Sequence, residues 1–147
     1  MLFRSDWIRE VSGLPLMLKG VQSVEDAKLA VDLGVDAIAL SNHGGRQYDG
    51  APAPVALLPR VVDAVGDSIE VLVDGGVRRG SDVVKACALG ARAVMFGRPY
   101  LYGLGAGGEL GVRWAIDHIT SGVTRTMGLI GETSITKLSP GVVARVR

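Results

Sequence analysis

The chain has almost no cysteine and almost no net charge, and both shortages narrow what it can be. Its 147 residues include one cysteine, Cys87, so no disulfide can form within the chain and no cysteine-based metal cluster is indicated. The formal net charge of +1 gives no reason to expect nucleic acid, a membrane surface or a polyanion as partner. No apolar run reaches the roughly 20 residues of a membrane span, and no signal peptide is visible. We therefore expect a reduced, soluble, cytoplasmic protein without a metal site, in which Cys87 is a buried structural thiol.

Apolar residues and glycine, in contrast, are abundant. The chain is 48% hydrophobic and contains 21 glycines, enough for the core of one ordinary domain and for many tight turns. Short apolar runs alternate with helical patterns, which is typical of βαβ units. We expect four strands, over residues 14–19, 35–40, 69–74 and 91–96. A helical turn at 7–11 precedes them, helices follow them at 100–104 and 110–119 with a glycine-rich turn between, and 135–138 form a last helical turn.

The intervening helices are marked by caps and stops. Ser23 is a plausible N-cap, and Gly34 ends the helix that follows it. A second helix is predicted to start at Pro59, because a missing N–H costs nothing in the first helical turn. The pair Ser81–Asp82 is predicted to cap a third helix, which Gly90 stops.

Polar or glycine residues fall at the carboxyl end of every predicted strand. These ends carry Lys19, Ser41 with His43, Asp74, and Gly97 with Arg98. In α/β folds ligands bind at the carboxyl ends of the strands, where loops with polar groups gather on a rigid sheet. The pattern matches one face of a (β/α)₈ TIM-type barrel, but only four units are present. We therefore expect residues 1–147 to form a single partial α/β domain, half of such a barrel with closing helices.

The run Ser41–Gln47 contains the chemically most informative residues. His43 can take a proton near neutral pH, and Arg46 offers a fixed fork for a carboxylate or phosphate. A base and an anion clamp three residues apart indicate removal of a proton from a small acid. The other histidine, His118, has no such neighbours and is interpreted as structural. If the acid is oxidised, an electron-accepting cofactor is needed, because no side chain here can receive a hydride.

Two glycine–arginine loops resemble a phosphate cradle. The segments 74–78 and 97–98 combine glycines, which let backbone N–H groups approach an anion, with an arginine each. The alternative is that the glycines only make tight strand-to-helix turns. Lys19 is open to two interpretations as well, a structural ion pair or a positive charge against an electron-accepting cofactor.

Four motifs together resemble the FMN-dependent L-2-hydroxy acid oxidases and dehydrogenases. They are Leu18-Lys19-Gly20, Ser41-Asn42-His43-Gly44-Gly45-Arg46-Gln47, Asp74-Gly75-Gly76-Val77-Arg78-Arg79-Gly80 and Gly97-Arg98-Pro99. The resemblance covers about residues 7–138 and matches strands five to eight of the family's barrel, its C-terminal half. It implies that the full-length form oxidises a small L-2-hydroxy acid, such as L-lactate, to the 2-oxo acid, with FMN as cofactor and oxygen, a quinone or a cytochrome as final acceptor. From this chain alone we expect weak or absent FMN binding.

The resemblance also implies roles for single residues. His43 is the expected base and contacts the substrate, and Arg46 is the clamp on its carboxylate. Lys19 is expected beside the flavin N1 and O2, and Ser41 against the flavin ring or ribityl chain. The ribityl chain and phosphate are expected at Asp74, Gly75, Gly76, Val77, Arg78, Gly97 and Arg98.

The family's first half-barrel, with its substrate-binding tyrosine, has no counterpart here. A non-catalytic or fragmentary half-barrel that keeps the phosphate loops is therefore the main alternative. Another FMN- or phosphate-binding barrel, similar to isopentenyl diphosphate isomerase or inosine monophosphate dehydrogenase, is disfavoured because it does not need the His43–Arg46 pair. Two unpaired edge strands, at 14–19 and 92–96, invite association, and we expect a homo-oligomer in the full-length form.

Overall fold

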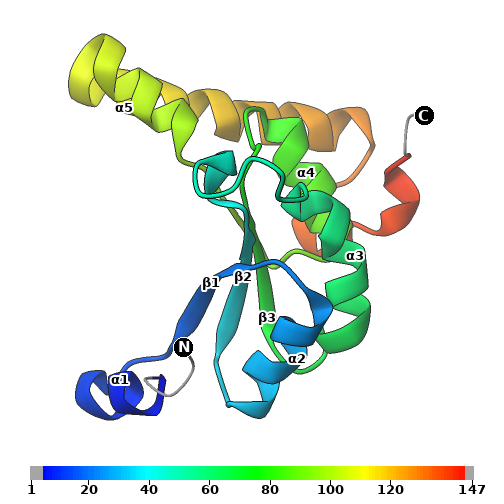
Figure 1. Cartoon of the computed structure of the whole chain (residues 1–147). Helices are drawn as coiled ribbons and strands as arrows, with labels where there is room; N and C mark the ends of the chain where they lie inside the picture. Colours follow the sequence, from blue (N-terminus) through cyan, green and yellow to red (C-terminus); the bar gives the residue numbers. More distant parts are fainter. Residues whose placement is uncertain (1–4, 145–147) are drawn as a thin grey trace.

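A four-stranded parallel sheet forms the centre of the computed structural model, which describes residues 5–144. The strands lie in chain order: β1 (Met17–Val21), β2 (Ala37–Ser41), β3 (Glu70–Asp74) and β4 (Ala93–Met95). Figure 1 shows the three connecting helices on one side of the sheet: α2 (Val24–Asp32), α3 (Pro54–Val65) and α4 (Gly80–Ala88). The remaining elements are α1 (Ser5–Ser12), α5 (Arg98–Leu129) and the 3₁₀ turns η2 (His43–Gly45), η3 (Ile135–Lys137) and η4 (Pro140–Val142).

The core lies between the sheet and these three helices. Successive side chains of a strand point to opposite faces, so every second residue of β2 and β3 reaches the helices. Those residues are Ile38, Leu40, Val71 and Val73, each no more than 3% exposed. They pack in one cluster with buried helix residues, including Ala27, Ala30, Leu58, Val61 and Ala86. Burial of this face holds the strands in a fixed register.

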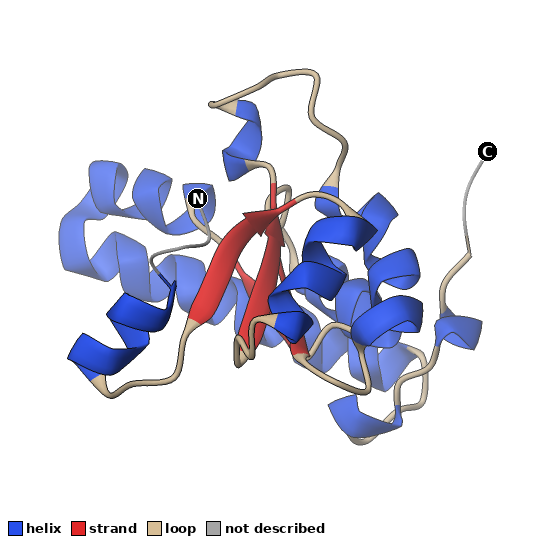
Figure 2. Cartoon of the chain, turned by 60° about the horizontal axis from the view of Figure 1, so that its bottom comes forward, coloured by secondary structure: helices blue, strands red, loops and turns tan. Residues whose placement is uncertain are grey.

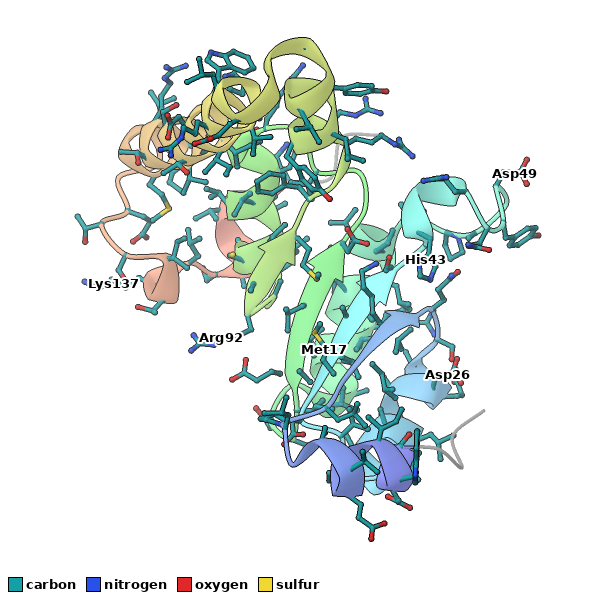
Figure 3. All side chains as sticks on the ribbon, turned by 90° about the vertical axis from the view of Figure 1, so that its left-hand side faces the viewer. Met17, Asp26, His43, Asp49, Arg92 and Lys137 are labelled. Atoms are coloured by element: carbon teal, nitrogen blue, oxygen red, sulfur yellow. The ribbon has the colours of Figure 1, made fainter. Side chains whose placement is uncertain are left out.

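Among residues 5–144, no layer of helices covers the other face of the sheet (Figure 3). Figure 3 looks toward this side, where Met17 is 40% exposed, and the half-buried Leu72 belongs to the same face by register. We call it the open face. At its carboxyl end, η2 and the loop that follows project beyond the strands, as Figure 2 shows.

Two predicted helix starts are wrong. α3 begins at Pro54, which takes the first helical position, and Pro59 lies inside the helix. The earlier start places Leu58 at a fully buried position on α3. α4 begins at Gly80 with Arg79 as N-cap residue, so Ser81 lies within the first turn. Asp82 does cap this helix, because its Oδ2 accepts hydrogen bonds from the backbone N–H groups of Arg78 and Arg79, each at 3.0 Å.

The predicted N-cap at Ser23 is confirmed, since its hydroxyl accepts from the Asp26 N–H at 3.0 Å. The predicted pair of helices around a glycine-rich turn is confirmed as well. α5 is interrupted at Gly107 and Gly108, whose backbone angles are not helical. Gly103 and Gly111, on either side, lie in backbone contact, because a Cβ on Gly111 would come within 1.9 Å of the Gly103 carbonyl oxygen.

The sole cysteine is less buried than predicted. Cys87 lies on α4 and is only partly covered, although burial raises the pKa of its thiol. Among residues 5–144, no helix is both long enough and apolar enough to cross a membrane.

Candidate active site

The loop after β2 is held in a left-handed conformation by the residues that precede it. His43 has φ 53° and is followed by Gly44 and Gly45 with φ 70° and 75°. The Ser41 hydroxyl accepts from the His43 N–H at 3.1 Å, and the Asn42 side chain accepts from the Gly44 N–H at 3.0 Å. Ser and Asn side chains commonly stabilise turns in this way. A positive φ at a non-glycine residue is costly and tends to occur at functional sites.

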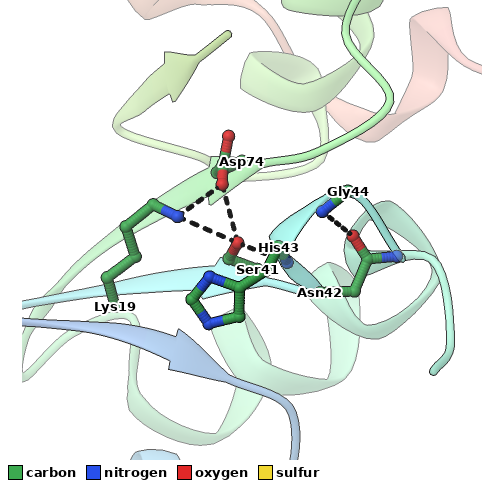
Figure 4. Close-up of polar contacts among 6 residues, drawn as sticks. All are labelled: Lys19, Ser41, Asn42, His43, Gly44 and Asp74. Atoms are coloured by element: carbon green, nitrogen blue, oxygen red, sulfur yellow. Dashed lines mark hydrogen bonds and ion pairs between the residues drawn. The ribbon is translucent and has the colours of Figure 1, made fainter. Parts of the chain in front are cut away.

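Three strand ends are joined by one hydrogen-bonded unit, drawn in Figure 4. Lys19 on β1 pairs with the Oδ2 atom of Asp74 on β3 at 2.6 Å, reaching across β2. Ser41 on β2 lies between them: it accepts from Lys19 Nζ at 3.1 Å and donates to Asp74 Oδ2 at 2.6 Å. Parallel register places Ser41 directly beside Asp74, so the contact follows from strand pairing.

The same unit sets the charge of Asp74. Burial by itself raises the pKa of this carboxyl, but hydrogen bonds from Lys19 and Ser41 and the positive charge of Lys19 outweigh it. The net effect is a pKa below the ordinary value for aspartate. Asp74 is therefore a carboxylate at neutral pH and a fixed partner for the ammonium group.

A bulge in β1 brings a glycine against the imidazole of His43. The register shifts between Lys19 and Val21, so Gly20 is the extra residue, with φ 103°. A Cβ on Gly20 would lie 2.9 Å from Nε2 of His43. Only glycine fits both this backbone conformation and this space.

A second contact across the sheet joins the end of β4 to the loop after β2. The Arg98 guanidinium, directly after β4, donates to the carbonyl oxygen of Gly44, after β2. A Cβ on Gly44 would come within 2.7 Å of this guanidinium, so the glycine allows the approach. The β4 loop and the β2 loop are thus fixed relative to each other.

These loops enclose a cavity of about 440 Å³ at the carboxyl ends of the strands. Every residue that the sequence singled out lines it except Ser41, which is fully buried beneath: Lys19, His43, Arg46, Asp74, Gly75, Gly76, Val77, Arg78, Gly97 and Arg98. Figure 3 shows His43 beyond the strand ends. The sequence interpretation missed Gly44, Gln47, Phe96 and Leu101 as lining residues. The first three directly adjoin predicted site residues, whereas Leu101 gave no signal because its position depends on where α5 begins.

The arrangement is that of a ligand-binding rim on a partial (β/α) barrel, with an acid-base group, guanidinium groups and glycine loops around one cavity. Comparison with known proteins agrees: residues 4–145 match the FMN-dependent dehydrogenase family. The chain belongs to this family, which confirms the resemblance found in the sequence.

The curated relatives are named for more than one activity. The chain is 58% identical over 134 residues to a pre-mycofactocin synthase of Mycobacterium tuberculosis, covering 91% of this chain and 34% of the relative. It is 52% identical over 141 residues to a putative L-lactate dehydrogenase of the same species, covering 96% and 34%. A peroxisomal (S)-2-hydroxy-acid oxidase of Oryza sativa is 48% identical over 134 residues, with 91% and 37% covered. The chain thus spans about a third of the length of the curated relatives it matches.

Solved structures confirm the partial barrel. A mandelate oxidase determined with benzoyl-formic acid superposes with a TM-score of 0.91 at 45% identity, covering 95% of this chain and 42% of that one. An (S)-mandelate dehydrogenase gives the same TM-score and identity, covering 96% and 39%. The predicted α/β barrel class is therefore correct, and the chain corresponds to part of the barrel.

The residues at the rim fit FMN, the family's cofactor. FMN has a phosphate, a polyol chain and a ring that becomes more negative on reduction. The rim offers the Arg78 and Arg98 guanidinium groups, backbone N–H groups at glycines, and the Lys19 ammonium. The cavity volume, about 440 Å³, also lies within the ordinary range for small-molecule sites.

Proposed function

We propose that this chain supplies the rim at which an FMN-dependent enzyme oxidises a small L-2-hydroxy acid to the 2-oxo acid. The observation that carries the proposal is the convergence of His43, Arg46 and Lys19 on one cavity beside two glycine–arginine loops. Family membership supports it, as do relatives named as an L-lactate dehydrogenase and a hydroxy-acid oxidase.

On the substrate side, His43 acts as the base and Arg46 binds the carboxylate. Oxidation breaks the Cα–H and O–H bonds of the hydroxy acid, forms the ketone C=O bond, and releases two protons and two electrons. His43 takes a proton at a ring nitrogen, a role that an imidazole can perform near neutral pH. Arg46 holds the substrate carboxylate through its fork, which orients the carbon that loses hydrogen. Both side chains are exposed toward the cavity and are free to meet a ligand.

On the cofactor side, FMN when bound supplies the acceptor for the two electrons. Lys19, which lines the cavity, would offset negative charge on the flavin ring with its ammonium group. Ser41 belongs to the same cofactor-side group through its contact with Lys19. The residues that would hold the phosphate and polyol line the same cavity: Asp74, Gly75, Gly76, Val77, Arg78, Gly97 and Arg98.

A second candidate function follows from one specific similarity. The pre-mycofactocin synthase shares 58% identity with this chain, compared with 52% for the putative L-lactate dehydrogenase. In that case the substrate is the precursor from which that relative makes pre-mycofactocin, and FMN binds at the same cavity.

The cytoplasmic location and the homo-oligomer stay predictions. One relative is peroxisomal, and another solved relative is a monotopic membrane protein.

A titration of the purified chain with FMN, followed by absorbance and fluorescence, tests the proposal. Saturable binding with a spectral shift, and bleaching of the flavin when L-lactate, glycolate or mandelate is added without oxygen, would support it. The Arg98→Ala variant should then bind FMN more weakly. Binding without bleaching by any hydroxy acid favours the second candidate. No binding at all would contradict a working FMN site in this chain.

A further inference from the structure

The Ser41 hydroxyl uses its whole hydrogen-bonding capacity inside the protein. Its side chain is 0% exposed at the end of β2. A serine hydroxyl has one hydrogen to donate and two lone pairs to accept with. The hydrogen goes to Asp74 Oδ2 at 2.6 Å, and the lone pairs take Lys19 Nζ and the His43 N–H, both at 3.1 Å.

The three partners of Ser41 belong to different parts of the site (Figure 4). Asp74 fixes the direction of the hydroxyl, because it accepts the only hydrogen. The two accepted bonds then fall on Lys19 and on the backbone of His43. His43 is the one non-glycine residue with positive φ in the part of the chain that the structure describes. Such a conformation persists only where the surroundings hold it.

We propose that Ser41 is a positioning residue: its Oγ holds the Lys19 ammonium and the left-handed backbone of His43 in place together. This inference rests on the proposed function, in which Lys19 and His43 are the reactive groups. Removal of the hydroxyl leaves the Asp74–Lys19 pair intact but frees the His43 N–H.

The neighbouring residue provides a matched control. Asn42 holds the Gly44 N–H at 3.0 Å through its side chain, again two residues along the chain, and its side chain contacts neither Lys19 nor Asp74 among the hydrogen bonds of residues 5–144. Asn42→Ala therefore removes this contact, together with the bond that Asn42 Nδ2 donates to the Pro52 carbonyl oxygen at 3.4 Å, without touching the Ser41 unit.

Amide hydrogen exchange and side-chain NMR on the full 147-residue chain, without cofactor or substrate, test the proposal. In Ser41→Ala we expect the His43 amide to exchange about tenfold faster, the change that loss of one ordinary hydrogen bond gives. The Lys19 Nζ resonance should move, and the amides of Ile38 and Leu40 should not change. In Asn42→Ala the Gly44 amide should exchange faster while the Lys19 Nζ resonance stays in place. If Ser41→Ala does not fold, Ser41→Cys, with a weaker donor and acceptor, should give a smaller acceleration at His43.

The proposal is overturned if His43 exchange and the Lys19 resonance are unchanged in a folded Ser41 variant. It is also overturned if Ser41→Ala weakens FMN binding without any change at His43 or Lys19, because the hydroxyl then acts on the cofactor itself. Failure of the proposed function looks different. In that case no hydroxy acid bleaches the bound flavin in the unaltered chain. The amide hydrogen exchange of the Ser41 variant is independent of that outcome.

Discussion

The two faces of the sheet are built from alternate residues of the same strands, yet they have opposite characters. On the helix side, Ile38, Leu40 and Val73 are at most 1% exposed and make no polar contact through their side chains. On the open face the register aligns Lys19 with Ala39 and Ser41 with Asp74, so charged and polar groups collect toward the carboxyl end. The helix side is a packed core, and the open face ends in a network of hydrogen bonds.

The difference shows how one strand can serve stability and chemistry at once. A period of two separates the residues that hold β2 in place from Ser41, which hydrogen-bonds Lys19, Asp74 and the His43 backbone. Leu40 and Ser41 are adjacent and both fully buried, but one packs under α3 and the other binds Lys19 and Asp74. Substitutions should therefore separate into those that unfold the chain and those that disable the rim.

The largest effect is expected at His43. In the FMN-loaded chain, His43→Ala should lower the rate of flavin reduction by about 10²- to 10⁴-fold, the usual contribution of a general base. FMN affinity and urea unfolding should not change, because the side chain is exposed at the rim. Stopped-flow absorbance measures the rate, with His118→Ala on α5 as control. Normal reduction in the His43 variant would contradict its role as the base.

Leu40→Ala should produce the largest change in folding stability. Its side chain is 0% exposed in the helix-side cluster, and such truncations cost about 2–5 kcal/mol. Leu72→Ala, on the half-buried open face, is the matched control and should cost less, because less apolar surface and a more open space are involved. Urea denaturation followed by circular dichroism gives both values. Equal losses in the free energy of unfolding would mean that the open face is as well packed as the helix side.

Gly20→Ala should moderately lower both the folding stability and the rate of flavin reduction. The new Cβ would lie 2.9 Å from Nε2 of His43 on a backbone with φ 103°, so we expect a loss of about 1–3 kcal/mol and slower flavin reduction. Gly13→Ala has a positive φ of 63° but nothing within 4 Å of the new Cβ. That control should lose stability through its backbone alone and leave flavin reduction intact. A Gly20 variant that behaves like the Gly13 variant would show that the contact with His43 is unimportant.

Arg46→Lys should change binding more than folding. A lysine keeps the charge but cannot form a two-pronged contact with a carboxylate, so KM should rise about tenfold with little change in kcat. Arg60→Lys, exposed on α3, is the control and should leave both constants unchanged. An unaltered KM in the Arg46 variant would contradict the carboxylate clamp.

The smallest effect concerns acid stability. The pKa of Asp74 is lowered in the folded chain, since hydrogen bonds from Lys19 and Ser41 and the Lys19 charge outweigh the opposing effect of burial. The carboxylate therefore stabilises the fold fully above the unfolded-state pKa of about 3.9, and this stabilisation is lost as the pH falls through the folded-state pKa. Asp74→Asn should flatten the decline of urea stability below about pH 4. Asp63→Asn, exposed on α3, is the control. If urea stability declines at low pH in the Asp74 variant as it does in the unaltered chain, the Lys19–Asp74 pair does not stabilise the fold.

Local signals were enough to predict much of the architecture. Apolar runs located all four strands to within a few residues, and Ser23 marked its helix start correctly. The start of α3 could not be chosen, because Pro54 and Pro59 both satisfy the preference for proline in a first turn, and only the burial of Leu58 decides between them.

The candidate site was predictable as a set of residues but not as a network. Strand ends meet at one edge of a parallel sheet, so the gathering of Lys19, His43 and Asp74 followed from their positions along the chain. The contacts of Ser41 depend on register across three strands, and the bulge at Gly20 shifts that register by one residue. Neither is encoded in a local pattern.

The contacts across the sheet interleave in a way that has a mechanical consequence. Lys19 spans β2 to reach Asp74, and Arg98 spans β3 to reach Gly44, so each contact passes over a strand that the other one anchors. One strand end cannot swing outward without straining a partner two strands away. The rim should therefore loosen as a single cooperative unit, with the amides of all four strand ends becoming exchangeable together rather than strand by strand.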